Sequence, residues 1–319
     1  MNKTYYYIGN GAYCYANSAS MLLTSISENI EPSLIEVLTG TSIGIAVELD
    51  KEKQSLSFDH SPTLLPDLGI TKALDILGFT YQTKAFNKEE DFLLALDELK
   101  KDLTKSPAVI GPVVMGHLTY NPDHKHLMDA DHFVLVYDID DNFVYIHDPE
   151  KFPHVFLKFE QLKRAWQGEG ISYKRGYYRY TFAPKRIESP SNEEIYSRAI
   201  SFFKTIYKDG ELMTDKKKVE IGGEAVRSYA KYIRERGLDD RERGHFVYFA
   251  LPLGAKRALD YFKFFTPYSK RLADLKYKQS VIFGTAHTYA TNKDWGQLAG
   301  EFEKLATVEE QFKNELLKS

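Results

Sequence analysis

The chain has 319 residues, of which 43% are hydrophobic and 14% aromatic, so it can bury one large core or the cores of two domains. Its formal net charge of −3 at pH 7 excludes the strongly basic surface of a nucleic-acid-binding protein. A single cysteine, Cys14, excludes an intrachain disulfide and a zinc site built from several cysteines, and it is typical of a reducing compartment.

The sequence also bears on location. No stretch is apolar for long enough to span a bilayer, and the N-terminus lacks the apolar segment and cleavage site of a secretion signal. We therefore expect a cytoplasmic protein that binds neither membranes nor nucleic acids.

The N-terminal region combines a short strand, a glycine loop and a helix. Residues 5–8 suit a strand, Gly9-Asn10-Gly11 predicts a tight loop, and helical spacing begins near Cys14 and runs to about residue 28. A third glycine and a Lys-Ser/Thr pair are missing, which disfavours a phosphate-binding loop. Glycine still lets the backbone approach a ligand closely, which suits a site beside Cys14.

The next region mixes helices and strands. Apolar spacing predicts helices at 34–38, 64–77 and 88–105, and strands at 79–86 and 109–115.

A polar segment, residues 116–130, precedes the following strand. We interpret it as a lid or substrate loop over one end of the sheet. His117, His124 and His126 in this segment could be metal ligands, but no Glu/His pair at helical spacing accompanies them. This favours a solvated loop, and we expect no metal and no cofactor.

Residues 131–149 carry the strongest local pattern, two apolar strands joined by Asp140-Asp141-Asn142. Such a pattern predicts an antiparallel hairpin. Because His132 opens the first strand and Asp148 closes the second, the hairpin brings an imidazole beside a carboxylate. His147 points to the opposite face by strand alternation, and we expect it to be structural.

The rest of the chain separates into a mixed part and a helical part. Strands are predicted at 155–159 and 176–182, with a helix at 160–167 between them. Pro, Ser and Asn residues then break both periodicities, which gives a domain at 1–185, a linker at 186–192 and a helical domain at 193–319. Within that last domain, helices are predicted at 193–208, 224–236, 241–265, 267–283 and 294–317.

These elements favour thiol chemistry in the first domain. A thiolate is the nucleophilic form of cysteine, and a helix N-terminus together with an imidazolium stabilises it. Cys14 would be the nucleophile, His132 the base that takes and returns the proton, and Asp148 the group that orients the imidazole. Cys14 and His132 are 118 residues apart (132 − 14), so only the tertiary fold can bring them together.

An acyl group attacked by the thiolate needs hydrogen-bond donors for its developing oxyanion. Residues near the thiol and in the polar segment could supply them or bind the substrate. The candidates are Asn10, Tyr13, Asn17, His117 and Tyr120.

Several segments together resemble the N-terminal domain of the butirosin biosynthesis protein H family. They are Gly11-Ala12-Tyr13-Cys14 at the helix start, Gly78 after the "ALDILG" helix, Pro112-Val113-Val114-Met115, Ala130-Asp131-His132-Phe133-Val134-Leu135-Val136 and Val144-Tyr145-Ile146-His147-Asp148-Pro149. The hairpin is also similar to that of papain-like peptidases that trim bacteriocin leaders. The resemblance covers about residues 1–185.

This resemblance implies an α+β fold, in which a papain-like N-terminal domain packs its first helix on an antiparallel sheet and an all-α domain follows. It also implies an acyl group carried on Cys14, passed from a carrier-protein thioester to a small-molecule amine, with His132 as base and Asp148 as orienting acid. Such an activity belongs to antibiotic or other secondary-metabolite biosynthesis. Papain-like peptidases place a glutamine six residues before the cysteine; Ile8 stands there in this chain, so no oxyanion residue carries over.

Two other functions are compatible with the same residues. A cysteine peptidase or amidase would resolve the acyl-enzyme with water, and a binding protein would keep the fold with a silent triad. Taken singly, Cys14 could be a small buried hydrophobe, His132 a core histidine and Asp148 a turn residue. The acyl donor, the acceptor and the formation of a homo-oligomer stay open.

Overall fold

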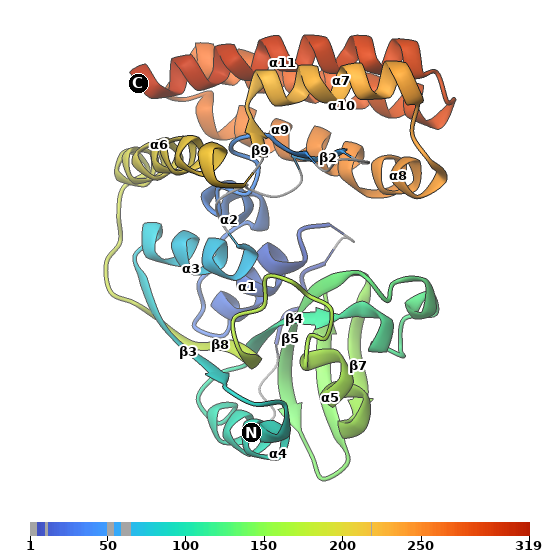
Figure 1. The fold of residues 1–319 in the computed structure, drawn as a ribbon. Helices are drawn as coiled ribbons and strands as arrows, with labels where there is room; N and C mark the ends of the chain where they lie inside the picture. Colours follow the sequence, from blue (N-terminus) through green and yellow to red (C-terminus); the bar gives the residue numbers. More distant parts are fainter. Residues whose placement is uncertain (1–4, 10–11, 50–53, 59–64, 218) are drawn as a thin grey trace. The chain divides into compact units, whose positions relative to one another are not determined.

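The computed structural model describes residues 5–9, 12–49, 54–58, 65–217 and 219–319 (Figure 1). The chain divides into two compact units, each built from two segments. Unit 1 is Met1–Ile35 with Ile70–Pro190, and unit 2 is Glu36–Gly69 with Ser191–Ser319. The fold is α+β, since unit 1 is a sheet with helices and unit 2 is mostly helical.

Unit 1 is built around a six-stranded antiparallel sheet of order β3-β8-β4-β5-β6-β7. Its strands are β3 (Phe79–Phe86), β4 (Ala108–Val114), β5 (Asp131–Ile139), β6 (Phe143–Asp148), β7 (Phe152–Lys158) and β8 (Tyr177–Arg186). The predicted hairpin is confirmed as β5 and β6, in which Leu135 lies opposite His147. Its turn forms because the Asp140 carboxylate accepts hydrogen bonds from the amides of Asn142 and Phe143, both at 2.7 Å.

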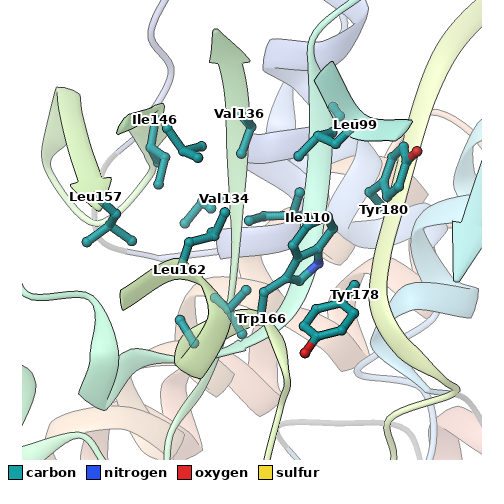
Figure 2. Packing of buried hydrophobic residues seen from close by; sticks show 14 of the residues in the cluster. Leu99, Ile110, Val134, Val136, Ile146, Leu157, Leu162, Trp166, Tyr178 and Tyr180 are labelled. Carbon is teal, nitrogen blue, oxygen red and sulfur yellow. The ribbon is translucent and has the colours of Figure 1, made fainter. Parts of the chain in front are cut away.

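Helices cover both faces of this sheet. They are α1 (Cys14–Thr24), α4 (Phe92–Asp102) and α5 (Phe159–Trp166). The part of α3 (Pro66–Ile76) from Ile70 on also belongs to this unit. Figure 2 shows Trp166 of α5 and Leu99 of α4 in one buried cluster with Val134 and Val136 of β5. Because successive strand residues point to opposite faces, Phe133 lies on the other face, where its ring meets Tyr15 of α1 at 6.0 Å.

Unit 2 is a helical assembly with a small sheet. Its helices are α6 (Asn192–Lys217), α7 (Gly223–Arg236), α8 (Asp240–His245), α9 (Leu251–Phe265), α10 (Lys270–Thr291) and α11 (Trp295–Lys318), with a π-helical turn, η4 (Phe246–Ala250), between α8 and α9. The strands β1 (Ala46–Leu49), β2 (Gln54–Ser57) and β9 (Val219–Ile221) form a sheet of order β2-β1-β9. Helix α11 packs against α7 and α10 (Figure 1).

The structure corrects the predicted domain boundary. Residues 36–69, which the sequence placed in a domain of residues 1–185, belong to unit 2. The physical reason is pairing at long sequence separation: Val47 of β1 lies opposite Glu220 of β9. The buried carboxylate of Glu36, within α2 (Pro32–Leu38), also pairs with the Arg257 guanidinium at 2.6 Å.

Other element predictions change in smaller ways. β9 contradicts the expectation of a wholly helical second part. Residues 5–9 have no regular secondary structure where a strand was predicted, and the first helix ends at Thr24 rather than near residue 28. The predicted helix at 241–265 is interrupted by η4. Within the described ranges, no helix is both long and apolar enough to cross a membrane.

Candidate active site

Cys14 is the first residue of α1, behind a strained turn. Tyr13 has a left-handed backbone with a φ of 59°, which is costly for a residue with a side chain. The side-chain amide of the buried Asn17 holds this turn, because its Nδ2 donates to the carbonyl oxygen of Tyr13 at 3.1 Å and to that of Ala12. The half-buried Cys14 side chain is thereby held at the start of a helix.

The described segment before Cys14, residues 5–9, contacts the chain at the end of β6. The Tyr7 hydroxyl donates to the backbone carbonyl of Asp148 at 3.0 Å. Gly9 lies so close to the sheet that an added Cβ would be 2.5 Å from the carbonyl oxygen of Pro149. The N-terminal segment therefore needs glycine here.

His132 and Asp148 form the pair that the hairpin predicted. Nε2 of His132 lies 2.7 Å from Oδ1 of Asp148, and both side chains are buried. The Cys14 side chain acts on the same imidazole, and it contributes to the raised pKa of His132. Since Asp148 occupies Nε2, Nδ1 is the nitrogen left for the thiol. The structure thus brings together all three predicted catalytic residues.

The charges of this pair stabilise each other. Burial alone would lower the pKa of His132, but the charge and hydrogen bond of Asp148, with a smaller contribution from Cys14, hold it well above its usual value. Burial would likewise raise the pKa of Asp148, and the positive charge and hydrogen bond of His132 bring it below its usual value. Both directions favour an imidazolium–carboxylate pair.

Two further donors fix Asp148. The Tyr120 hydroxyl donates to Oδ2 at 2.7 Å, and the Glu150 amide donates to Oδ1 at 2.7 Å. Burial, with the charge of Asp148, raises the pKa of Tyr120 well above its usual value, so Tyr120 stays a donor. Tyr120 was predicted to bind oxyanion or substrate; the contact that the structure gives it is with the carboxylate of Asp148.

The predicted lid is a folded insertion. The Met115 amide donates to the Ala130 carbonyl at 2.9 Å and closes its ends, and Nδ1 of His124 lies 2.8 Å from the Gly116 carbonyl oxygen. These contacts frame the short 3-10 turns η2 (Met115–His117) and η3 (His124–His126). Through Tyr120, the insertion reaches the His132–Asp148 end of the sheet, as expected.

The remaining predicted residues divide into three cases. Tyr13 and Asn17 shape the turn before Cys14, as described. His117 is not brought to the triad, since its charged neighbours are Arg164, Glu169 and His124. Asn10 lies outside the described residues. Among the described residues, no group of three His, Cys, Asp or Glu side chains has the arrangement of a metal site.

His147 points away from the triad, and its contacts fit the expected structural role. Its Nδ1 accepts from the His154 amide at 3.2 Å, so Nε2 carries the proton and faces the Tyr5 carbonyl oxygen at 3.3 Å. Burial and the neighbouring His154 lower its pKa to about 4. A neutral His147 thus helps to hold the N-terminal segment on the sheet.

Sequence reasoning missed Tyr7 and Glu150. Burial raises the pKa of the half-buried Glu150 carboxyl, and the charges of His132 and Asp148 both act on it. Glu150 could have been found from the sequence, because it lies two residues after Asp148. No feature of the sequence points to Tyr7, because 141 residues separate it from Asp148.

Comparison with known proteins gives two matches. Residues 216–317 match the family described as the YobF C-terminal domain. Over 317 residues the chain is 40% identical to "Uncharacterized protein YobF" of Bacillus subtilis (strain 168), and the match covers 98% of each chain. Since the similarity extends over nearly the whole length of both chains, and not only over the C-terminal domain, this chain belongs to the YobF family.

Proposed function

We propose that unit 1 is a papain-like thiol acyltransferase, which moves an acyl group from a thioester to an amine through an acyl-enzyme on Cys14. One observation carries the proposal: His132 and Asp148 form a buried hydrogen-bonded pair, and Cys14 at the start of a helix acts on the same imidazole. The sequence resemblance to the butirosin biosynthesis protein H family supports the choice of a carrier-protein thioester as donor and a small-molecule amine as acceptor.

The first half-reaction uses the proton on His132. Transfer of the thiol proton to His132 gives a thiolate beside an imidazolium, and the buried Asp148 stabilises that cation. The thiolate attacks the thioester carbonyl, and the tetrahedral intermediate expels the donor thiol as His132 returns its proton. The backbone N–H of Cys14, at the start of α1, would receive the oxyanion.

The second half-reaction decides between transfer and hydrolysis. The acceptor amine attacks the Cys14 thioester, His132 takes one of its protons, and the Cys14 thiolate leaves, which yields an amide and the free enzyme. Water in place of the amine would make the same site a peptidase or amidase. The chemistry on Cys14 is common to both, so the acceptor must be identified by experiment.

The direct test is the reactivity of Cys14. We expect iodoacetamide to alkylate Cys14 rapidly at pH 6–7, and we expect His132→Ala to slow this at least about tenfold, because the imidazolium that stabilises the thiolate is gone. Intact mass would confirm one adduct. His126→Ala, which removes an exposed histidine of η3, is the matched control and should react like the wild type.

A second step identifies the reaction. Incubation with an N-acetylcysteamine thioester should give an acyl adduct that Cys14→Ser cannot form, and an added amine should divert it to amide. Release to free acid alone would assign a hydrolase. A thiol that reacts equally with and without His132, and forms no adduct, would assign a binding protein with a silent triad.

A further inference from the structure

Unit 2 exposes several large apolar side chains on neighbouring elements. Of the twelve large apolar residues that are exposed in the described part of the chain, five lie in η4, α9 and α10. Tyr248 is 83% exposed, Val281 53% and Tyr277 51%. Single exposed apolar residues are normal on a protein surface, whereas a concentration of them marks a surface that another molecule covers.

Contacts between α9 and α10 bring these side chains to one face. The helices are antiparallel: Nε2 of His287 lies 3.1 Å from the Val247 carbonyl oxygen, and at the other end the ring of Phe262 meets that of Tyr277 at 5.4 Å. Residues three or four apart lie on the same side of a helix, so Val281 follows Tyr277 on α10. By the same spacing, the α9–α10 face consists of Tyr248, Leu259, Phe262, Tyr277 and Val281.

The surroundings of the α9–α10 face are basic. Residues 251–291 contain seven Lys and Arg side chains against two Asp and no Glu, a net charge of +5, although the whole chain carries −3. Two of the seven cations are buried, and the other five reach the surface. Lys263 and Lys278, which directly follow Phe262 and Tyr277, are both exposed. Within the described ranges, Lys278 forms no ion pair.

This charge selects the kind of partner. A second copy of the chain would bring two basic surfaces together, which opposes association. A helix that is apolar on one side and acidic on the other has the complementary charge, and helices commonly bind through residues spaced three and four apart.

We propose that the α9–α10 face binds an acidic amphipathic helix of a partner protein. Its apolar side chains would cover Leu259, Tyr277 and Val281. Its carboxylates would meet Lys263 and Lys278. The proposal does not depend on acyl transfer in unit 1.

The test uses two stapled helical peptides of about 18 residues, each roughly 27 Å long. Both carry leucines spaced three and four apart; one has glutamates on its other side and the control has lysines. Fluorescence anisotropy gives the Kd of each for the intact protein. Because the whole chain is negative, unspecific attraction favours the lysine peptide. We expect the glutamate peptide to bind at least about tenfold more tightly; equal affinity, or a preference for the lysine peptide, would overturn the proposal.

Variants locate the binding surface. Tyr277→Ser removes an apolar side chain from the face, and Lys278→Glu reverses a neighbouring charge. Each should weaken binding of the glutamate peptide at least about fivefold. Tyr6→Ser and Lys208→Glu make the same changes at exposed positions outside the face, and they should leave the Kd unchanged. Equal Kd values for all four variants would overturn the assignment to this face.

Two other occupants of the α9–α10 face would give different results. A second copy would give a dimer in sedimentation velocity that Val281→Lys dissociates. A membrane surface would give co-sedimentation with vesicles containing phosphatidylglycerol, weakened by Lys278→Glu. We expect neither result, and either one without a preference for the glutamate peptide would overturn the proposal.

Discussion

Asp148 is held by three hydrogen-bond donors, and each restrains it differently. His132 and the Glu150 amide share Oδ1, while Tyr120 alone donates to Oδ2. When a buried carboxylate loses a hydrogen-bond donor, its oxygen stays out of contact with water and the lost hydrogen bond is not replaced, so the folded state is destabilised. Tyr120 therefore matters for the orientation of His132, although it does not contact the thiol in any described interaction.

Replacing Tyr120 with Phe tests this restraint. We expect Tyr120→Phe to lower the free energy of unfolding by about 1.5–3 kcal/mol, because one oxygen of a buried carboxylate loses its partner. Urea denaturation measures this. Tyr145→Phe is a matched control, since the Tyr145 hydroxyl donates to Asp140 at the surface, and it should cost about 0.5 kcal/mol or less. An equal loss in the free energy of unfolding for the two variants would show that the Tyr120 hydroxyl does not restrain Asp148.

The charged state of His132 predicts a pH dependence. Its pKa is raised on folding, chiefly by Asp148 against the opposing effect of burial. The stability it contributes is therefore fully present below its unfolded pKa of about 6.5 and is lost as pH rises through the folded pKa. In a Cys14→Ser background, which removes the thiol titration, the free energy of unfolding should fall as the pH rises above about 6.5. Adding Asp148→Asn should flatten this slope; an unchanged slope would show that another group titrates.

At the scale of elements, the N-terminal segment and the end of β6 act together. Tyr5, Tyr7 and Gly9 contact residues 147–149, and Cys14 lies only five residues after Gly9 in the sequence. A shift of this segment would displace Cys14 relative to His132 without altering either residue. The triad thus depends on contacts outside it.

Gly9→Ala tests this dependence. The new methyl group would overlap the Pro149 backbone, so we expect a loss of about 1–3 kcal/mol in the free energy of unfolding and slower alkylation of Cys14. The same substitution at Gly284, inside α10 with open space around it, should instead stabilise by about 0.5–1 kcal/mol. Unchanged alkylation in Gly9→Ala would show that the segment does not position the thiol.

At the scale of the whole molecule, the chain passes between the two units three times, after Ile35, Gly69 and Pro190. Residues 36–69 leave unit 1 and return to it at Ile70, so neither unit is a continuous piece of chain. In unit 2 they supply β1, which pairs with β9, and Glu36, which pairs with Arg257. The linker before α6 is therefore a poor place to divide the protein.

A chain ending at Pro190 tests this organisation. Without residues 191–319, β1 lacks β9 and the buried Glu36 lacks Arg257, so we expect residues 36–49 to lose their protection from hydrogen exchange. Breaking a buried ion pair of this kind costs about 3–5 kcal/mol. Hydrogen-exchange mass spectrometry against the full chain gives the comparison. Full protection of residues 36–49 in the shorter chain would restore the simpler boundary near residue 185.

The sequence by itself determined the local parts of this protein. The β5–β6 hairpin follows from strand alternation and the Asp140 turn, and with it comes the His132–Asp148 pair, because only 16 residues separate the two side chains. Tertiary structure alone decided the approach of Cys14 to His132, the contacts of Tyr7 and Tyr120 with Asp148, and the place of residues 36–69 in unit 2. Local periodicity carries no information on which distant surfaces bury each other, since that choice depends on the packing of the whole chain.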